Sequence, residues 1–162
     1  MRRSFLPVLI ALSLLTLFTV AASAVTGKSA VGTWKLDVGR SSFANMPVPR
    51  AERLVVSTDE PTMLKWRLIG ASSNGMTYTS AYDGPIDGSE HALTSSEVGG
   101  MIAYSRMSDG GVKWTLKDKS GEIVETGSSH LSADGNTLTL RGTTQGPKGE
   151  SNFVSVFTRV EE

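Results

Sequence analysis

The chain has 162 residues, no cysteine, and 16 basic side chains against 16 acidic ones. The lack of cysteine excludes a disulfide framework, a thiol nucleophile and a thiolate metal site. The length is that of one domain, and the balanced charge argues against a surface for nucleic acid or an anionic membrane.

The first 24 residues have the pattern of a cleavable signal peptide. Arg2 and Arg3 precede an uncharged, mostly apolar stretch from Phe5 to Ala24, which ends in the small-x-small sequence of residues 22–24. An uncleaved membrane anchor is the alternative, because an apolar run of about 20 residues can span a bilayer. The small residues at its end, and the absence of a basic cluster after it, favour cleavage.

Cleavage would deliver residues 25–162 as a mature domain to the periplasm or the exterior of a bacterium. The twin arginines leave export in the folded state open, but the short basic region and the very apolar core favour the general secretory (Sec) route. No cysteine follows the apolar run, which excludes a lipoprotein anchor. We therefore expect a mature domain that is not embedded in the membrane.

The mature part of the chain is predicted to be all-β. No dozen residues after residue 25 repeat apolar side chains at helical spacing. Strand-sized segments instead recur at intervals of roughly ten residues, between turns rich in glycine, aspartate and asparagine. The predicted strands are residues 32–37, 52–58, 62–70, 77–82, 91–94, 101–107, 112–118, 122–131, 137–144 and 152–160.

The turns between these strands have specific signals. Asn74-Gly75 predicts a type I′ hairpin turn, and Asp83-Gly84-Pro85 predicts a turn that ends the strand before it. Segments 101–107 and 152–160 carry apolar residues on both faces, so either face could point inward. About eight to ten strands joined in sequence predict an antiparallel up-and-down meander. Closure into a barrel is favoured over a sandwich, because closure removes exposed sheet edges.

The first predicted strand contains Gly32-Thr33-Trp34, which resembles the G-x-W signature of lipocalins. With residues 35–37, Tyr82-Asp83-Gly84 and residues 133–139, it resembles bacterial exported lipocalin-like (calycin-type) domains, most of which have no assigned activity. The resemblance covers nearly all of residues 31–160 and implies a lipocalin-like barrel.

The resemblance also implies that a basic residue of the last strand covers the tryptophan at the base of the barrel. Arg159 is the residue that could cover Trp34, and such stacking is worth roughly 0.5–2 kcal/mol. The alternative is that Trp34 is simply a core residue and Arg159 an exposed strand residue. In either case Gly32, Trp34 and Arg159 would have a structural role in barrel closure.

No motif in the chain predicts catalysis, metal binding or a cofactor. His91 and His130 are the only imidazoles, and neither has a neighbour at ligand spacing. Glu122 and Glu125 fall on different faces of their strand and make a poor acid–base pair. We expect a protein that is not an enzyme.

Aromatic and polar side chains on the predicted strands are the candidates for ligand binding: Trp66, Tyr78, Tyr82, Tyr104, Arg106 and Trp114. If they point inward, they could line a pocket for a small hydrophobic or amphipathic ligand, with Arg106 or a tyrosine hydroxyl holding its polar group. The alternative is a barrel whose interior is filled by these side chains. The expected function is that of an exported binder. An interaction or structural module of the cell envelope, with no small-molecule ligand, stays open.

Overall fold

The computed structural model describes residues 28–96, 100–146 and 149–161, so the predicted signal peptide lies outside the described residues. The one helical element among them is a short 3-10 helix, η1 (Val38–Arg40). The strands are β1 (Gly32–Leu36), β2 (Ser42–Phe43), β3 (Ala51–Asp59), β4 (Met63–Ala71), β5 (Thr77–Pro85), β6 (Glu90–Ala92), β7 (Ser95–Ser96), β8 (Met101–Arg106), β9 (Val112–Lys117), β10 (Ile123–Leu131), β11 (Thr137–Gly146) and β12 (Gly149–Val160). In this part of the chain no helix has the length and apolar character needed to cross a membrane.

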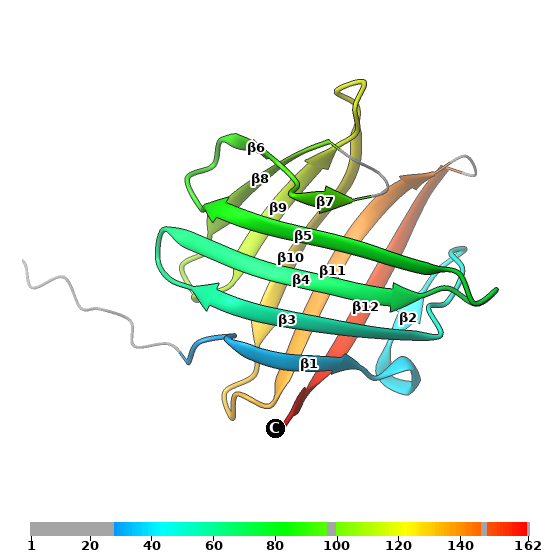
Figure 1. The fold of residues 1–162 in the computed structure, drawn as a ribbon, viewed down its shortest axis with the longest axis horizontal. Helices are drawn as coiled ribbons and strands as arrows, with labels where there is room; N and C mark the ends of the chain where they lie inside the picture. The colour runs from blue at the N-terminus through cyan, green and yellow to red at the C-terminus, as the bar shows by residue number, and fades with distance from the viewer. Residues whose placement is uncertain (1–27, 97–99, 147–148, 162) are drawn as a thin grey trace, which may run out of the picture.

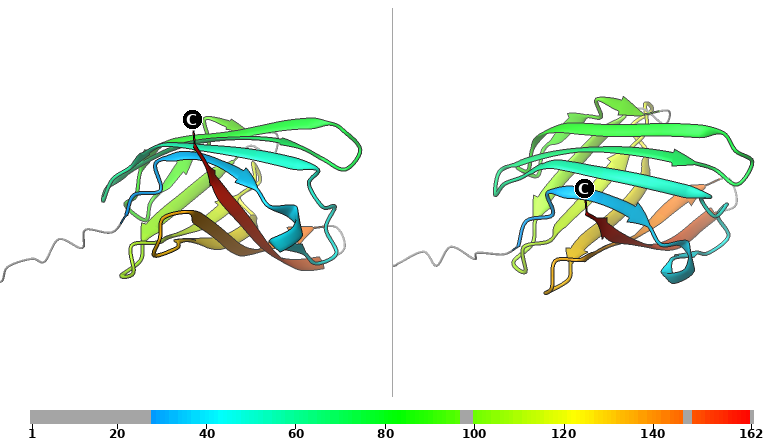
Figure 2. Two further views of the ribbon diagram at one scale, coloured as in Figure 1. Left: turned by 90° about the horizontal axis from the view of Figure 1, so that it is seen from below. Right: turned by 60° about the horizontal axis from the view of Figure 1, so that its bottom comes forward.

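The strands form one antiparallel sheet that curves into a nearly closed barrel. Their order is β6-β8-β9-β10-β11-β12-β1-β3-β4-β5-β7, and β2 pairs with β12 off this path. In Figure 1, β1, β3, β4 and β5 form a front layer that crosses β9 to β12 behind it, and the turned views of Figure 2 show the two layers joined where β1 meets β12. The predicted all-β meander and its closure into a barrel are confirmed.

The seam of the barrel lies between β5 and β8, which share no pairing in the described residues. The chain between them bridges the seam, because β6 pairs with β8 and β7 pairs with β5. The rings of Tyr82 and Tyr104 meet across it, with centroids 4.9 Å apart. The barrel is therefore completed by side-chain contacts where its backbone ladder is interrupted.

Trp34 belongs to the hydrophobic core of the barrel and is 0% exposed. The Arg159 guanidinium carbon lies 4.2 Å from the centre of the Trp34 ring, and Arg159 donates hydrogen bonds to the carbonyls of Gly135 and Val31 at 2.8 and 2.7 Å. Gly32 makes room for this arrangement, since a Cβ there would lie 2.3 Å from Arg159 Nη1. The stacking of Arg159 on Trp34 is the contact that the lipocalin resemblance implied for these two residues; their role in closing the barrel stays a prediction.

Two of the predicted turns are wrong. Asn74 does not have positive φ, as a type I′ turn would require; only Gly75 does, at 86°. The hydrogen bonds from Gly75 N–H to Ser72 C=O and from Ser72 N–H to Met76 C=O, each 2.9 Å, define a three-residue loop. The Asn74 Oδ1 atom accepts from the Met76 N–H at 3.1 Å, which stabilises that loop instead.

The second wrong turn is Asp83-Gly84-Pro85, which remains in β5 and pairs with β4 as far as Pro85. The glycine is needed here for space and not for a turn. A Cβ on Gly84 would lie 2.8 Å from the hydroxyl oxygen of Tyr82, whose ring is packed against this position.

Candidate functional site: the barrel cavity

The two layers enclose a cavity of about 1120 Å³, slightly larger than the roughly 300–1,000 Å³ of typical ligand pockets. The barrel is therefore hollow and not filled by its own side chains. Segments 101–107 and 152–160, whose inward faces the sequence left open, contribute Ile102, Tyr104 and Arg106, and Phe153, Ser155 and Phe157. Most of the other lining is aliphatic: Leu54, Val56, Leu64, Leu68, Leu93, Val112, Leu116, Leu131, Leu138 and Leu140.

Five of the six predicted ligand-binding residues line this cavity: Trp66, Tyr78, Tyr104, Arg106 and Trp114. Tyr82 does not, because its side chain is 1% exposed and packed within the hydrophobic core. Its hydroxyl donates to the Pro85 carbonyl at 2.7 Å, and its ring supports Tyr104. That the five residues bind a ligand stays a prediction.

Glycines on the neighbouring strands determine where the aromatic rings of the cavity can lie. Gly70 is paired with Tyr78, and Gly127 is paired with Trp114. A Cβ on either glycine would come within 2.2 or 2.3 Å of the partner's ring. Each ring therefore extends over the backbone of the next strand, a position that any larger residue would block.

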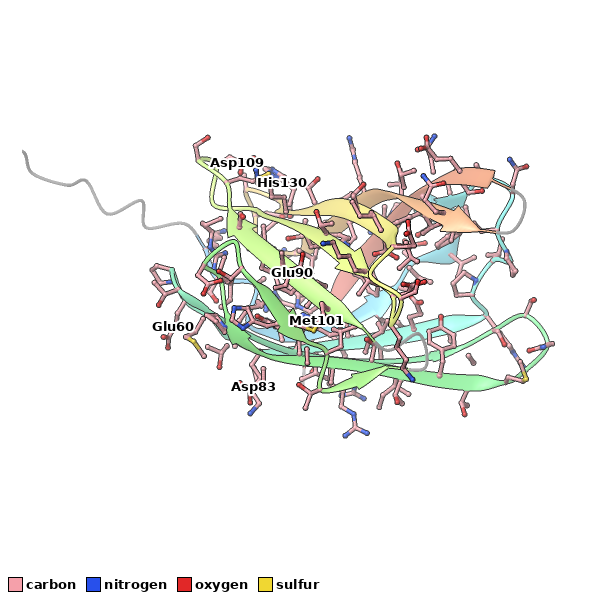
Figure 3. All side chains as sticks on the ribbon, turned by 90° about the horizontal axis from the view of Figure 1, so that it is seen from above. Glu60, Asp83, Glu90, Met101, Asp109 and His130 are labelled. Atoms are coloured by element: carbon pink, nitrogen blue, oxygen red, sulfur yellow. The ribbon has the colours of Figure 1, made fainter. Side chains whose placement is uncertain are left out.

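The guanidinium group of Arg106 is bound by other residues of the protein. Its Nη1 lies 2.8 Å from Asp59 Oδ1, and its Nη2 donates to the Glu60 carbonyl at 2.5 Å. Asp59 also accepts the Ala30 N–H at 2.8 Å, so the ion pair ties β8 to the β3–β4 hairpin and the N-terminal segment. The Arg106 Nε is buried and has no hydrogen-bond partner among the described residues. In Figure 3, Glu60 and Asp109 lie at this end of the barrel.

His91 lies in β6 and His130 in β10, and each is beside one aspartate. His91 Nε2 is 3.0 Å from Asp87 Oδ1, and the exposed His130 Nδ1 is 3.4 Å from Asp109 Oδ2; Figure 3 shows the latter pair close together at one end of the barrel. Among the residues with described positions, no group of three or more His, Cys, Asp or Glu side chains could hold a metal ion.

Two glutamates in the cavity were missed by the sequence reasoning. Glu52 of β3 and Glu125 of β10 line it from different layers of the barrel. Glu52 accepts a hydrogen bond from the Tyr78 hydroxyl at 2.5 Å, and Glu125 accepts one from Trp114 Nε1 at 2.8 Å. Glu52 could have been found by alternation, since it shares a strand face with Leu54 and Val56. Glu125 was considered only as a partner for Glu122.

Burial raises the pKa of both glutamates above the ordinary value for the residue. The hydrogen bonds from Tyr78 and Trp114 oppose this rise. The charge of Glu52 further raises the pKa of Glu125, and burial also raises the pKa of Tyr78 and Tyr104. Both carboxyl groups therefore stay protonated to higher pH than they would in water.

This shift predicts a pH dependence of stability. Above the unfolded-state pKa near 4.5, the native protein binds more protons at these sites than the unfolded chain does. The free energy of unfolding should therefore fall as pH rises from 4.5 through the raised pKa values. In E52Q/E125Q this contribution is absent. Urea unfolding from about pH 4.5 to about pH 8 should show a stability loss in the original protein that the double variant lacks; parallel profiles would contradict the assignment.

Comparison with known proteins gives a match at the level of structure alone. Neither a family model nor a curated protein matches the sequence. The zebrafish ileal bile acid-binding protein, solved in complex with cholic acid, superposes with a TM-score of 0.51 and 13% identity, covering 82% of this chain and 100% of that one. A de novo designed fluorescence-activating β-barrel gives 0.46 and 14%, covering 80% and 93%. The first likeness shows that the chain shares the β-barrel fold of the zebrafish protein.

Proposed function

We propose that the chain is an exported bacterial lipocalin-like protein that binds a small hydrophobic or amphipathic ligand inside its barrel, without turnover. The observation that carries the proposal is the cavity of about 1120 Å³. Its walls are mostly aliphatic and aromatic, with a few polar groups, which is the composition of small-molecule sites. The apolar segment of residues 1–24 supports the export part of the proposal.

The fold and the placement of polar groups agree with a binding role. The zebrafish protein of the same fold is described as a bile acid-binding protein and was solved with cholic acid. Neither histidine of this chain is among the residues that line the cavity, and each pairs with one aspartate. The aromatic groups of the cavity, in contrast, offer a large apolar surface with polar edges.

A matched pair of variants on β10 tests where a ligand binds. Ser129 lines the cavity, whereas its neighbour Ser128 is on the other face of the strand. Nile red, a neutral dye of apolar pockets, should bind the full chain and saturate at one dye per chain. Ser129→Phe should weaken binding by about tenfold or more by filling the cavity, while Ser128→Phe should leave the affinity within about twofold.

The dye titration is read by fluorescence, with circular dichroism as a check that both variants fold. Equal affinities in the two variants would place the dye on the outer surface and contradict an internal site. No binding by the original protein would favour the envelope module without a small-molecule ligand.

A further inference from the structure

We propose that the cavity selects amphiphiles with a positively charged amine head, held between Glu52 and Glu125, over those with an anionic head. This inference rests on the proposed function, since it names the class of ligand for the same cavity. It is carried by the position of the two carboxyl groups, their hydrogen bonds, and the distribution of positive charge around them.

The two carboxyl groups enter the cavity without a positive partner. Among the described residues, no ion pair joins Glu52 or Glu125 to a lysine, arginine or histidine. The described basic residues that line the cavity are Lys28 and Arg106. Lys28 donates to the Asp134 carbonyl at 2.8 Å, and Arg106 is paired with Asp59.

These two basic residues lie at the opposite end of the barrel from the glutamates. Arg106 binds the β3–β4 hairpin at the far end of β3, whereas Glu52 is the second residue of β3 and pairs with Gly70 near the end of β4. Glu125 lies near the start of β10. The cavity therefore has one end with Glu52 and Glu125 and no described basic residue in its lining. At the other end Lys28 and Arg106 lie among the acidic residues Asp59, Glu60 and Asp109.

Each glutamate has a free acceptor for a ligand. Tyr78 and Trp114 donate to the Oε1 atoms of Glu52 and Glu125, and among the described residues the second oxygen of each carboxyl has no hydrogen bond. An ammonium group has three donors and no acceptor, which complements two carboxylate oxygens. A carboxylate head has only acceptors and would meet like charge.

The cost of burying an ionised carboxylate also favours an amine over an anionic ligand. A carboxylate in an apolar cavity is unfavourable unless an opposite charge compensates it. An incoming amine supplies that charge, so its binding favours ionisation of the glutamates and releases protons. The aliphatic walls accommodate the apolar part of the ligand, such as an alkyl chain or a ring system.

Three ligands with the same alkyl chain test the proposal: decylamine, decanol and decanoate, each displacing Nile red from the full chain near neutral pH and below its micellar concentration. We expect decylamine to bind about tenfold tighter than decanol, and decanoate to bind weakest. In E52Q/E125Q the advantage of decylamine should fall to about threefold or less, while decanol binds as before. Glu122→Gln, at an exposed turn, controls for the loss of a negative charge and should change nothing.

The outcomes separate this proposal from the proposed function. Decanoate binding tightest, or an amine preference that survives in E52Q/E125Q, would overturn the amine inference and leave the binding role intact. Failure of all three ligands and of the dye to bind would contradict the binding role itself.

If the double variant does not fold, the pH dependence of decylamine binding by the original protein tests the same proposal. The affinity for decylamine should rise with pH as Glu52 and Glu125 ionise, and the affinity for decanol should not rise with it. Tyr78 and Tyr104, the other titratable groups of this region, have raised pKa values and stay neutral. The Arg106–Asp59 pair lies at the other end. A decylamine affinity that does not change with pH would overturn the proposal.

Discussion

Trp34→Ala should lower the free energy of unfolding by about 3–5 kcal/mol. Trp34 is 0% exposed and is among the largest fully buried side chains of the barrel. Its truncation removes apolar surface from the core, leaves a void there, and takes away the ring on which Arg159 stacks. Its Nε1 also donates to the Ala30 carbonyl at 2.8 Å, which would lose its partner.

Trp66→Ala is the matched control, because Trp66 is the same residue type on the cavity wall. Its removal enlarges an existing space, so we expect a loss smaller by about 1 kcal/mol or more. Urea unfolding followed by circular dichroism measures both values. Equal losses for the two variants would mean that Trp34 is no more tightly packed than a residue of the cavity wall.

Gly127→Ala should cost about 1–3 kcal/mol, although it adds only a methyl group. That methyl would lie 2.3 Å from the Trp114 ring and 2.7 Å from the Arg141 carbonyl oxygen. The ring can turn away, but the carbonyl belongs to the β10–β11 ladder and can move only with the sheet. Gly146→Ala, whose nearest atom would be 3.9 Å away, should be close to neutral.

The double variant G127A/W114A tests the mechanism of this effect. If the ring causes part of the strain, the two substitutions together should destabilise less than the sum of their separate effects. Additive losses would contradict a direct clash between Gly127 and Trp114. A neutral Gly127→Ala variant would contradict the close approach altogether.

Strand positions and most inward faces could be predicted from the sequence, because alternation and turn residues are local signals. Leu64, Trp66 and Leu68 share the inward face that their spacing indicated. The alternation of apolar and polar residues did not show which face of the last strand points inward, because its outer face is also partly covered. Val156 is buried there because the segment before η1 lies against β12, with the Asp37 N–H donating to the Val156 carbonyl at 2.8 Å.

The meeting of Glu52 and Glu125 at one end of the cavity could not be predicted in the same way. Alternation can put Glu52 on an inward face, but it cannot show that the interior is hollow. Nor does it show that β10 brings Glu125 to the same cavity, because that depends on the closure of the whole barrel. The turn predicted at Gly84 was wrong for a related reason. Glycine is needed there because of the Tyr82 ring, a contact that local turn preference does not reveal.

Native mass spectrometry of the folded protein, before and after organic extraction, tests the central claim most directly. Binding inside the barrel predicts a population with one small apolar or amphipathic molecule per chain, lost on extraction and restored by adding it back, with a higher melting temperature. A chain that carries no such molecule, and gains no thermal stability from a panel of lipids, amines and sterols, would contradict the claim.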